Sequence, residues 1–101
     1  MNREQYLLVC LSEECAEVQQ AISKSLRFGL DNFHPISKKT NHIDICNELN
    51  DVIAVVTLLI REGLLDFEII NNIEDSVNKT EKIEKWMKNS TEQGILDENN
   101  Y

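Results

Sequence analysis

The segment Val52–Ile60 is apolar around almost the whole circumference of a helix, with Thr57 as its one interruption. It is far too short to cross a membrane, which takes roughly 20 apolar residues, so other protein must cover it on every side. A chain of 101 residues forms one domain and cannot supply two independent cores. The segment therefore predicts a bundle that a second copy of the chain completes.

The first helix is expected at residues 3–28. Apolar side chains recur there at steps of three and four residues, as on one face of a helix. Gly29 is expected to end the helix in left-handed geometry. A loop is expected over 31–39, where Pro35 disfavours helix at the preceding residue.

Two further helical regions are expected after the loop. Thr40 or Asn41 can cap a second helix that runs to Glu62. A third region is expected over 66–89, with a break near 76–80, where weak helix formers gather. The fold class is thus all-α: a bundle of long antiparallel helices, with a four-helix core completed by oligomerisation. The domain is expected to span 1–89, followed by a flexible tail over 90–101.

The charge balance excludes some classes of partner. The formal net charge is −8, from 18 acidic and 10 basic side chains, so a nucleic-acid polymer is not expected to bind. An acidic protein can still bind a polyanion when metal ions supply positive charge. The N-terminus lacks the apolar core of a signal peptide, and we expect a soluble, cytoplasmic protein with no membrane partner.

Four carboxylates interrupt the apolar stripes of the first two helices. At 100° per residue, Glu14 falls on the stripe centred on Leu7, and Glu17 lies beside it on the next turn. Glu13 points roughly 120° away from that stripe and is expected either at the surface or in a supporting position behind the ligands. Glu48 and Asp51 repeat the pattern on the second helix. Side chains three residues apart lie side by side on a helix, so two facing pairs predict one cluster of four acids.

Such a cluster needs positive charge. No Lys or Arg occurs between residues 4 and 23 or between 41 and 60, and buried carboxylates without a counter-charge are costly. Mg²⁺, one ion or two, fits a set of oxygen ligands. A di-iron centre would need a Glu-x-x-His pair, which these acids lack. A solvated acidic face is the plainer interpretation of either pair taken alone.

Two motifs carry a family resemblance over residues 4–88. The first is Glu13-Glu14-Cys15-Ala16-Glu17, and the second is Glu48-Leu49-Asn50-Asp51. Their order and apolar flanks resemble the EExxE…ExxD signature of the all-α nucleoside triphosphate pyrophosphatases, and the flanking sequences are similar to the MazG-like branch.

The resemblance implies a hydrolase that acts on phosphoric anhydride bonds. It implies that an NTP or dNTP is converted to the monophosphate and pyrophosphate with Mg²⁺, for which Mn²⁺ can substitute, in a dimer or tetramer. By position, Glu14, Glu17, Glu48 and Asp51 would be the metal ligands and the catalytic residues. The residues implied to bind substrate are Lys24, Arg27, Asn78, Lys79 and Lys82. The alternative is a non-catalytic helical protein that mediates oligomerisation or interaction with the same fold.

Overall fold

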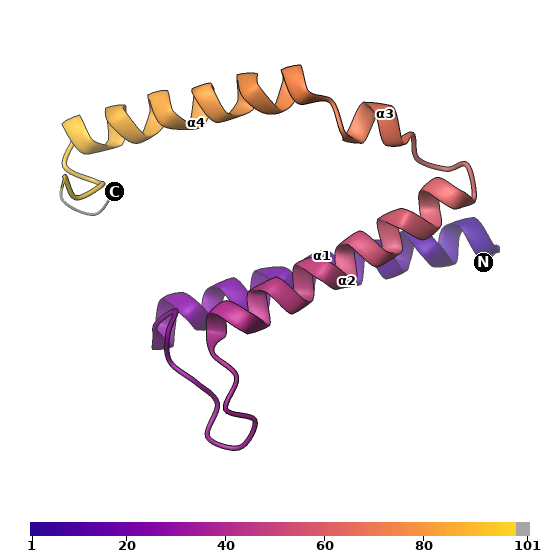
Figure 1. The fold of residues 1–101 in the computed structure, drawn as a ribbon, viewed down its shortest axis with the longest axis horizontal. Coiled ribbons are helices and arrows are strands. Elements are labelled where there is room, and N and C mark those ends of the chain that lie inside the picture. The colour runs from indigo at the N-terminus through magenta and orange to yellow at the C-terminus, as the bar shows by residue number, and fades with distance from the viewer. Residues whose placement is uncertain (99–101) are drawn as a thin grey trace. The chain divides into compact units, whose positions relative to one another are not determined.

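The computed structural model describes residues 1–98 of the chain. In this part the regular elements are helices (Figure 1), namely α1 (Arg3–Phe28), α2 (Asn41–Arg61), α3 (Phe67–Ile70) and α4 (Ile73–Glu92). The predicted all-α fold class is confirmed. The chain divides into two compact units, Met1–Asp66 and a second unit that begins at Phe67.

Helix α1 has the predicted bounds, and both of its ends have local causes. The Asn2 side chain accepts a hydrogen bond from the Gln5 backbone N–H at 2.8 Å, and the Gln5 side chain accepts one from the Asn2 N–H at 3.0 Å. This reciprocal pair satisfies two backbone donors at the helix start. Gly29 ends the helix with φ 97° and ψ 139°. The left-handed helical geometry expected for Gly29 is therefore wrong: φ is positive, but ψ is extended, a combination that only glycine adopts readily.

Helices α1 and α2 form an antiparallel hairpin (Figure 1). Thr40, the first of the two predicted alternatives, caps α2 by accepting a hydrogen bond from the Ile43 N–H at 3.2 Å. At the open end of the hairpin, the Arg3 guanidinium lies 2.7 Å from the Glu62 carboxylate. The pairing places the start of α1 beside the end of α2. The loop between the helices closes the opposite end.

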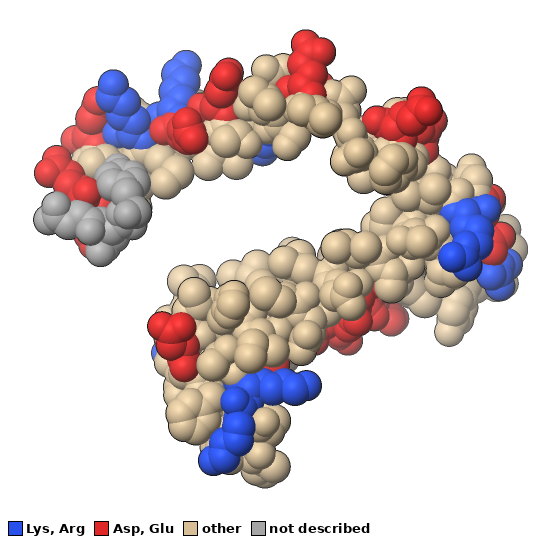
Figure 2. Space-filling model, viewed as in Figure 1, with Lys and Arg blue, Asp and Glu red and all other residues tan. Residues whose placement is uncertain are grey.

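The buried core is small. Among residues 1–98 the buried apolar side chains are Leu7, Ala21 and Leu59. Within the apolar segment Val52–Ile60, Leu59 is fully buried, but Ile53 remains 61% exposed. The visible face of the hairpin is mostly uncharged (Figure 2). Helix α1 alone does not cover this segment. The oligomer was predicted because of such uncovered apolar surface, and it stays a prediction.

The third helical region differs from the sequence prediction. The break predicted near 76–80 is wrong: α4 is continuous there, and Thr80 Oγ1 donates to the Ser76 carbonyl at 3.0 Å. The break lies before Ile73 instead, because the Asn72 side chain caps α4 by accepting from the Asp75 N–H at 2.9 Å. Asparagine is among the best N-cap residues.

The end of α4 also lies further along the chain than predicted, at Glu92 instead of residue 89. Beyond it, Gly94 has φ 76°, and the Ile95 N–H donates to the Ser90 carbonyl at 2.9 Å, which caps the helix. The predicted tail therefore begins inside a helix. Its residues 99–101 lie outside the described part, and its flexibility stays a prediction. No helix among the described residues is long and apolar enough to span a bilayer.

Candidate metal centre

The hairpin brings the four predicted carboxylates together. Glu14 and Glu17 occupy adjacent turns of α1, and Glu48 and Asp51 occupy adjacent turns of α2. One carboxylate oxygen from each of the four lies within 4.8 Å of the others. Glu13 is exposed and stands outside this cluster, as its position on the helix predicts. The predicted cluster is therefore present, whereas its metal-binding role stays a prediction.

Two members of the cluster are half-buried and carry the electrostatic strain. Glu14 Oε2 and Glu48 Oε2 are both shielded from solvent and lack a hydrogen-bond partner. Burial raises the pKa of Glu14, and the charges of Glu17 and Asp51 raise it further. A hydrogen-bonding contact with the Glu17 carboxyl raises the pKa of Glu48, followed by burial and the neighbouring charges. Both shifts show that negative charge is disfavoured here in the protein alone.

The other two members correct the expectation of four buried acids, since Glu17 and Asp51 are exposed. Within residues 1–98, no Lys, Arg or His side chain forms an ion pair with any of the four. Unpartnered, half-buried oxygens on a set of hard oxygen ligands are what a divalent cation such as Mg²⁺ would satisfy. The residues present fit such an ion.

A cavity of about 190 Å³ adjoins the cluster and contains one predicted substrate-binding residue, Lys24. Glu17 and Glu48 line the same cavity. Sequence reasoning missed three polar residues there, namely Gln20, Asn41 and Asp44. A signal existed for two of them. Gln20 stands three residues after Glu17 and Asp44 four residues before Glu48, so each shares a helix face with a cluster acid.

The structure does not bring the other predicted substrate-binding residue of α1 into this cavity. Arg27 lies outside the cavity lining, and its guanidinium carbon stands 4.7 Å from the centre of the Phe28 ring. A guanidinium over an aromatic face is a favourable pairing in itself. Of the two cations, only Lys24 lines the cavity beside the carboxylates.

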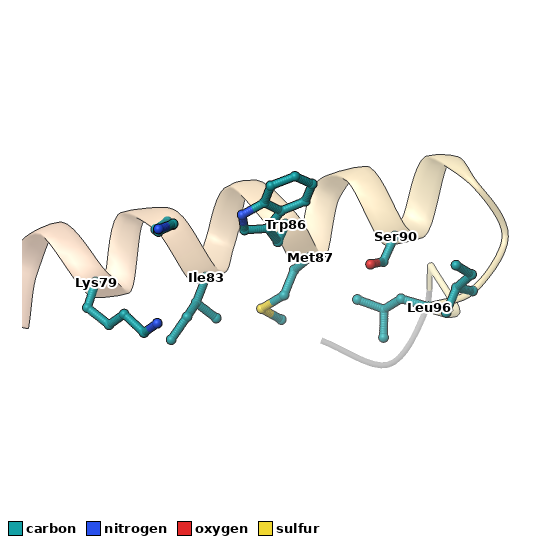
Figure 3. A pocket seen from close by; sticks show the side chains of 8 residues that line it. Lys79, Ile83, Trp86, Met87, Ser90 and Leu96 are labelled. Atoms are coloured by element: carbon teal, nitrogen blue, oxygen red, sulfur yellow. The ribbon is translucent and has the colours of Figure 1, made fainter.

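The remaining predicted substrate-binding residues lie on α4, in the second unit. Lys79 and Lys82 line a cavity of about 520 Å³ with Ile83, Trp86 and Met87 (Figure 3). Asn78 is exposed and does not line it. The side chain of Trp86 is 56% exposed in the single chain.

The comparisons with known proteins agree with the sequence motifs. The family model of the MazG nucleotide pyrophosphohydrolase domain matches residues 2–87. Comparisons with curated proteins and with solved structures give no match. The matched residues include the whole four-carboxylate cluster and most of the chain. The chain therefore belongs to the MazG nucleotide pyrophosphohydrolase family.

Proposed function

We propose that the protein is a Mg²⁺-dependent nucleoside triphosphate pyrophosphohydrolase, which converts an NTP or dNTP to the monophosphate and pyrophosphate. The observation that carries the proposal is the cluster of Glu14, Glu17, Glu48 and Asp51 in a chain of this family. Water would attack the α-phosphorus, the bond from that phosphorus to the bridging oxygen would break, and pyrophosphate would leave.

The four carboxylates would hold the metal and manage the proton. A bound Mg²⁺ supplies positive charge to the phosphates and makes a coordinated water a better nucleophile. Mn²⁺, with similar oxygen preferences, is expected to substitute. One of the four carboxylates would accept the proton of the attacking water. The exposed pair, Glu17 and Asp51, leaves the cluster open to solvent on one side, through which a substrate can enter.

Lys24 is the cation best placed to act on the phosphates. It lines the cavity shared with Glu17 and Glu48 yet forms no ion pair with them in the described part of the chain. Its ammonium is thus available to neutralise the charge that develops on the leaving pyrophosphate. Arg27 remains a candidate for substrate binding with weaker support, since it does not line this cavity. The second unit contributes the candidates Asn78, Lys79 and Lys82.

Self-association is part of the proposal. The side chain of Ile53 is 61% exposed in the middle of an apolar segment, and a second copy of the hairpin presents the same kind of surface. Light scattering should give the mass of a dimer or tetramer, and Ile53→Lys should lower that mass. A monomeric wild-type protein at working concentrations would contradict this part.

The direct test is incubation with a panel of NTPs and dNTPs in the presence of Mg²⁺, with identification of the products. We expect pyrophosphate, not orthophosphate. Glu48→Gln and Asp51→Asn should abolish its release while circular dichroism shows unchanged helix content.

Glu13→Gln is the matched control, because Glu13 belongs to the same motif but stands outside the cluster. Its turnover should stay close to that of the wild type. Turnover like the wild type in both Glu48→Gln and Asp51→Asn would refute the site. The alternative, a non-catalytic interaction protein, would be favoured if the wild type hydrolysed no nucleotide and its melting temperature did not change with Mg²⁺.

A further inference from the structure

A second cavity continues from the one beside the cluster. It has a volume of about 290 Å³ and lies under the loop that joins α1 to α2. Three residues line both cavities, namely Lys24, Asn41 and Asp44. The shared residues place the two cavities next to each other, one beside the carboxylates and the other under the loop. A ligand anchored at the cluster can therefore extend into the loop cavity.

The lining of the loop cavity differs from that of the cluster cavity. Phe28 and Phe33 contribute aromatic rings, and Asn32, His34 and Pro35 complete the wall. The two phenylalanine residues are 56% and 52% exposed, so each leaves apolar surface uncovered by the chain. Apolar walls with a few polar groups are typical of small-molecule sites, whose volumes run from roughly 300 to 1,000 Å³.

Backbone hydrogen bonds fix this loop independently of the aromatic side chains. Phe33 and Thr40 form an antiparallel bridge, the His34 N–H donates to the Lys39 carbonyl at 3.0 Å, and the Asn41 N–H donates to the Asn32 carbonyl at 2.9 Å. The rings are thus presented by a preformed frame, which lowers the entropic cost of binding a ligand. The same bonds mean that Phe33 can be truncated without removing what holds the loop.

Charge beside the rings favours a ligand that is both flat and anionic. The Lys38 ammonium lies 5.5 Å from the centre of the Phe33 ring, and Arg27 lies over Phe28. Lys24 stands where the two cavities meet. Every nucleobase has a flat π-face that can stack on an aromatic side chain, whereas a bare polyphosphate has none.

We propose that the cavity under the α1–α2 loop is the nucleobase subsite, with Phe33 as its stacking residue and with the sugar near Asn41 and Asp44. This inference rests on the proposed function, because it places the phosphates at the carboxylate cluster. The Asn41 amide nitrogen donates to the Gly29 carbonyl at 2.7 Å, which leaves the amide oxygen to act as an acceptor. With the Asp44 carboxylate it offers acceptors to the sugar hydroxyls.

Equilibrium binding tests the subsite without turnover. The probes are the α,β-methylene analogues of the four ribonucleoside triphosphates, which cannot be cleaved at that bond, together with inorganic tripolyphosphate, all with Mg²⁺. The tightest analogue should bind the wild type more tightly than tripolyphosphate does. Phe33→Ala should weaken that analogue by about 5- to 150-fold, the range that loss of one base–aromatic stack implies, and should leave tripolyphosphate unchanged. Phe33→Leu, which keeps apolar volume but loses the ring, should also weaken it.

The matched control is Ile36→Ala, in the same loop. Ile36 is 87% exposed and does not line the cavity, so its affinities should equal those of the wild type. Three results would overturn the subsite: equal affinity of Phe33→Ala and wild type for the tightest analogue, an equal loss for tripolyphosphate, or a changed oligomer mass, which would place Phe33 in a subunit interface. Absence of pyrophosphate release would refute the proposed function separately, since the binding measurement requires no hydrolysis.

Discussion

Glu14 and Glu48 should make metal affinity depend steeply on pH. Their pKa values are raised above the ordinary 4.5, by burial and by carboxyl neighbours respectively as the first cause. As the pH falls from neutral toward 4.5, these two groups therefore take up protons while an ordinary carboxylate would still be charged. A metal ion binds the deprotonated form, so each proton must leave before the ion can bind. Affinity should be highest above both raised pKa values and should weaken as the pH falls through them.

The size of this pH dependence follows from the number of carboxyl groups with a raised pKa, which is two. Each protonated ligand weakens the apparent affinity by up to about tenfold per pH unit, so two such groups give up to about a hundredfold per unit. Glu14→Gln removes one of the two titrating groups. The slope of log Kd against pH should accordingly approach −2 in the wild type and −1 in Glu14→Gln, although the variant binds more weakly at every pH.

Stability should respond in the opposite sense to affinity. A carboxyl whose folded pKa is raised binds more protons in the folded than in the unfolded state, so metal-free stability falls as the pH rises from 4.5 through the raised pKa. Glu48→Gln removes the part of this penalty that comes from Glu48. Its metal-free melting temperature should therefore exceed that of the wild type near pH 8, with the difference shrinking near pH 4.5, while Mg²⁺ no longer raises it.

Calorimetric titration with Mn²⁺ or Mg²⁺, repeated in two buffers of different ionisation enthalpy, counts the released protons directly. Differential scanning calorimetry with and without metal gives the second half of the prediction. A metal affinity that does not weaken as the pH falls from neutral to 4.5, or a metal-free melting temperature lowered by Glu48→Gln at high pH, would refute the reasoning. Either result would mean that the cluster is not strained by unpaired charge.

Three further outcomes follow from the packing. Leu59→Ala should lower the free energy of unfolding by about 2–5 kcal/mol in urea, because Leu59 is fully buried, whereas Leu26→Ala, at an 83% exposed position, should change it little. Asn72→Ala should destabilise α4 by about 0.5–2 kcal/mol, seen as faster amide exchange in its first turn; unchanged exchange would contradict the cap. Arg3→Gln should lower the melting temperature slightly at low salt and not at high salt, and below pH 4.5 the difference should fade, since the Arg3 hydrogen bond lowers the pKa of Glu62.

The first two helices could be predicted from sequence because local signals agree with the apolar pattern. Gly29 and Thr40 stand at the ends of periodic segments, and both act where the sequence indicates. The third region was predicted less well. The start of α4 depends on which of several polar residues turns its side chain back on the backbone, and Asn72 does so while the residues near Ser76 stay helical.

The carboxylate cluster could be predicted because residues three apart on two antiparallel helices must meet if the helices pack face to face. The loop cavity could not. Its walls depend on backbone hydrogen bonds such as that between Asn41 and Asn32, which leave no periodic trace in the sequence. The sequence pattern likewise does not predict where Lys79 and Lys82 lie relative to the cluster, because that depends on how helix α4 packs.

The hydrogen bonds that hold the α1–α2 loop have a consequence for how nucleotide selectivity can differ between related proteins. The two ends of the loop are held together by the hydrogen bond from Asn41 to Gly29 and by the bridge between Phe33 and Thr40. The cluster acids lie further along the two helices. If the loop binds the nucleobase, nucleobase recognition and bond cleavage depend on separate segments of the chain. Substitutions between residues 30 and 39 can then retune selectivity while the metal ligands keep their positions. Exchanging this loop between relatives would be a direct way to transfer base preference on a constant catalytic frame.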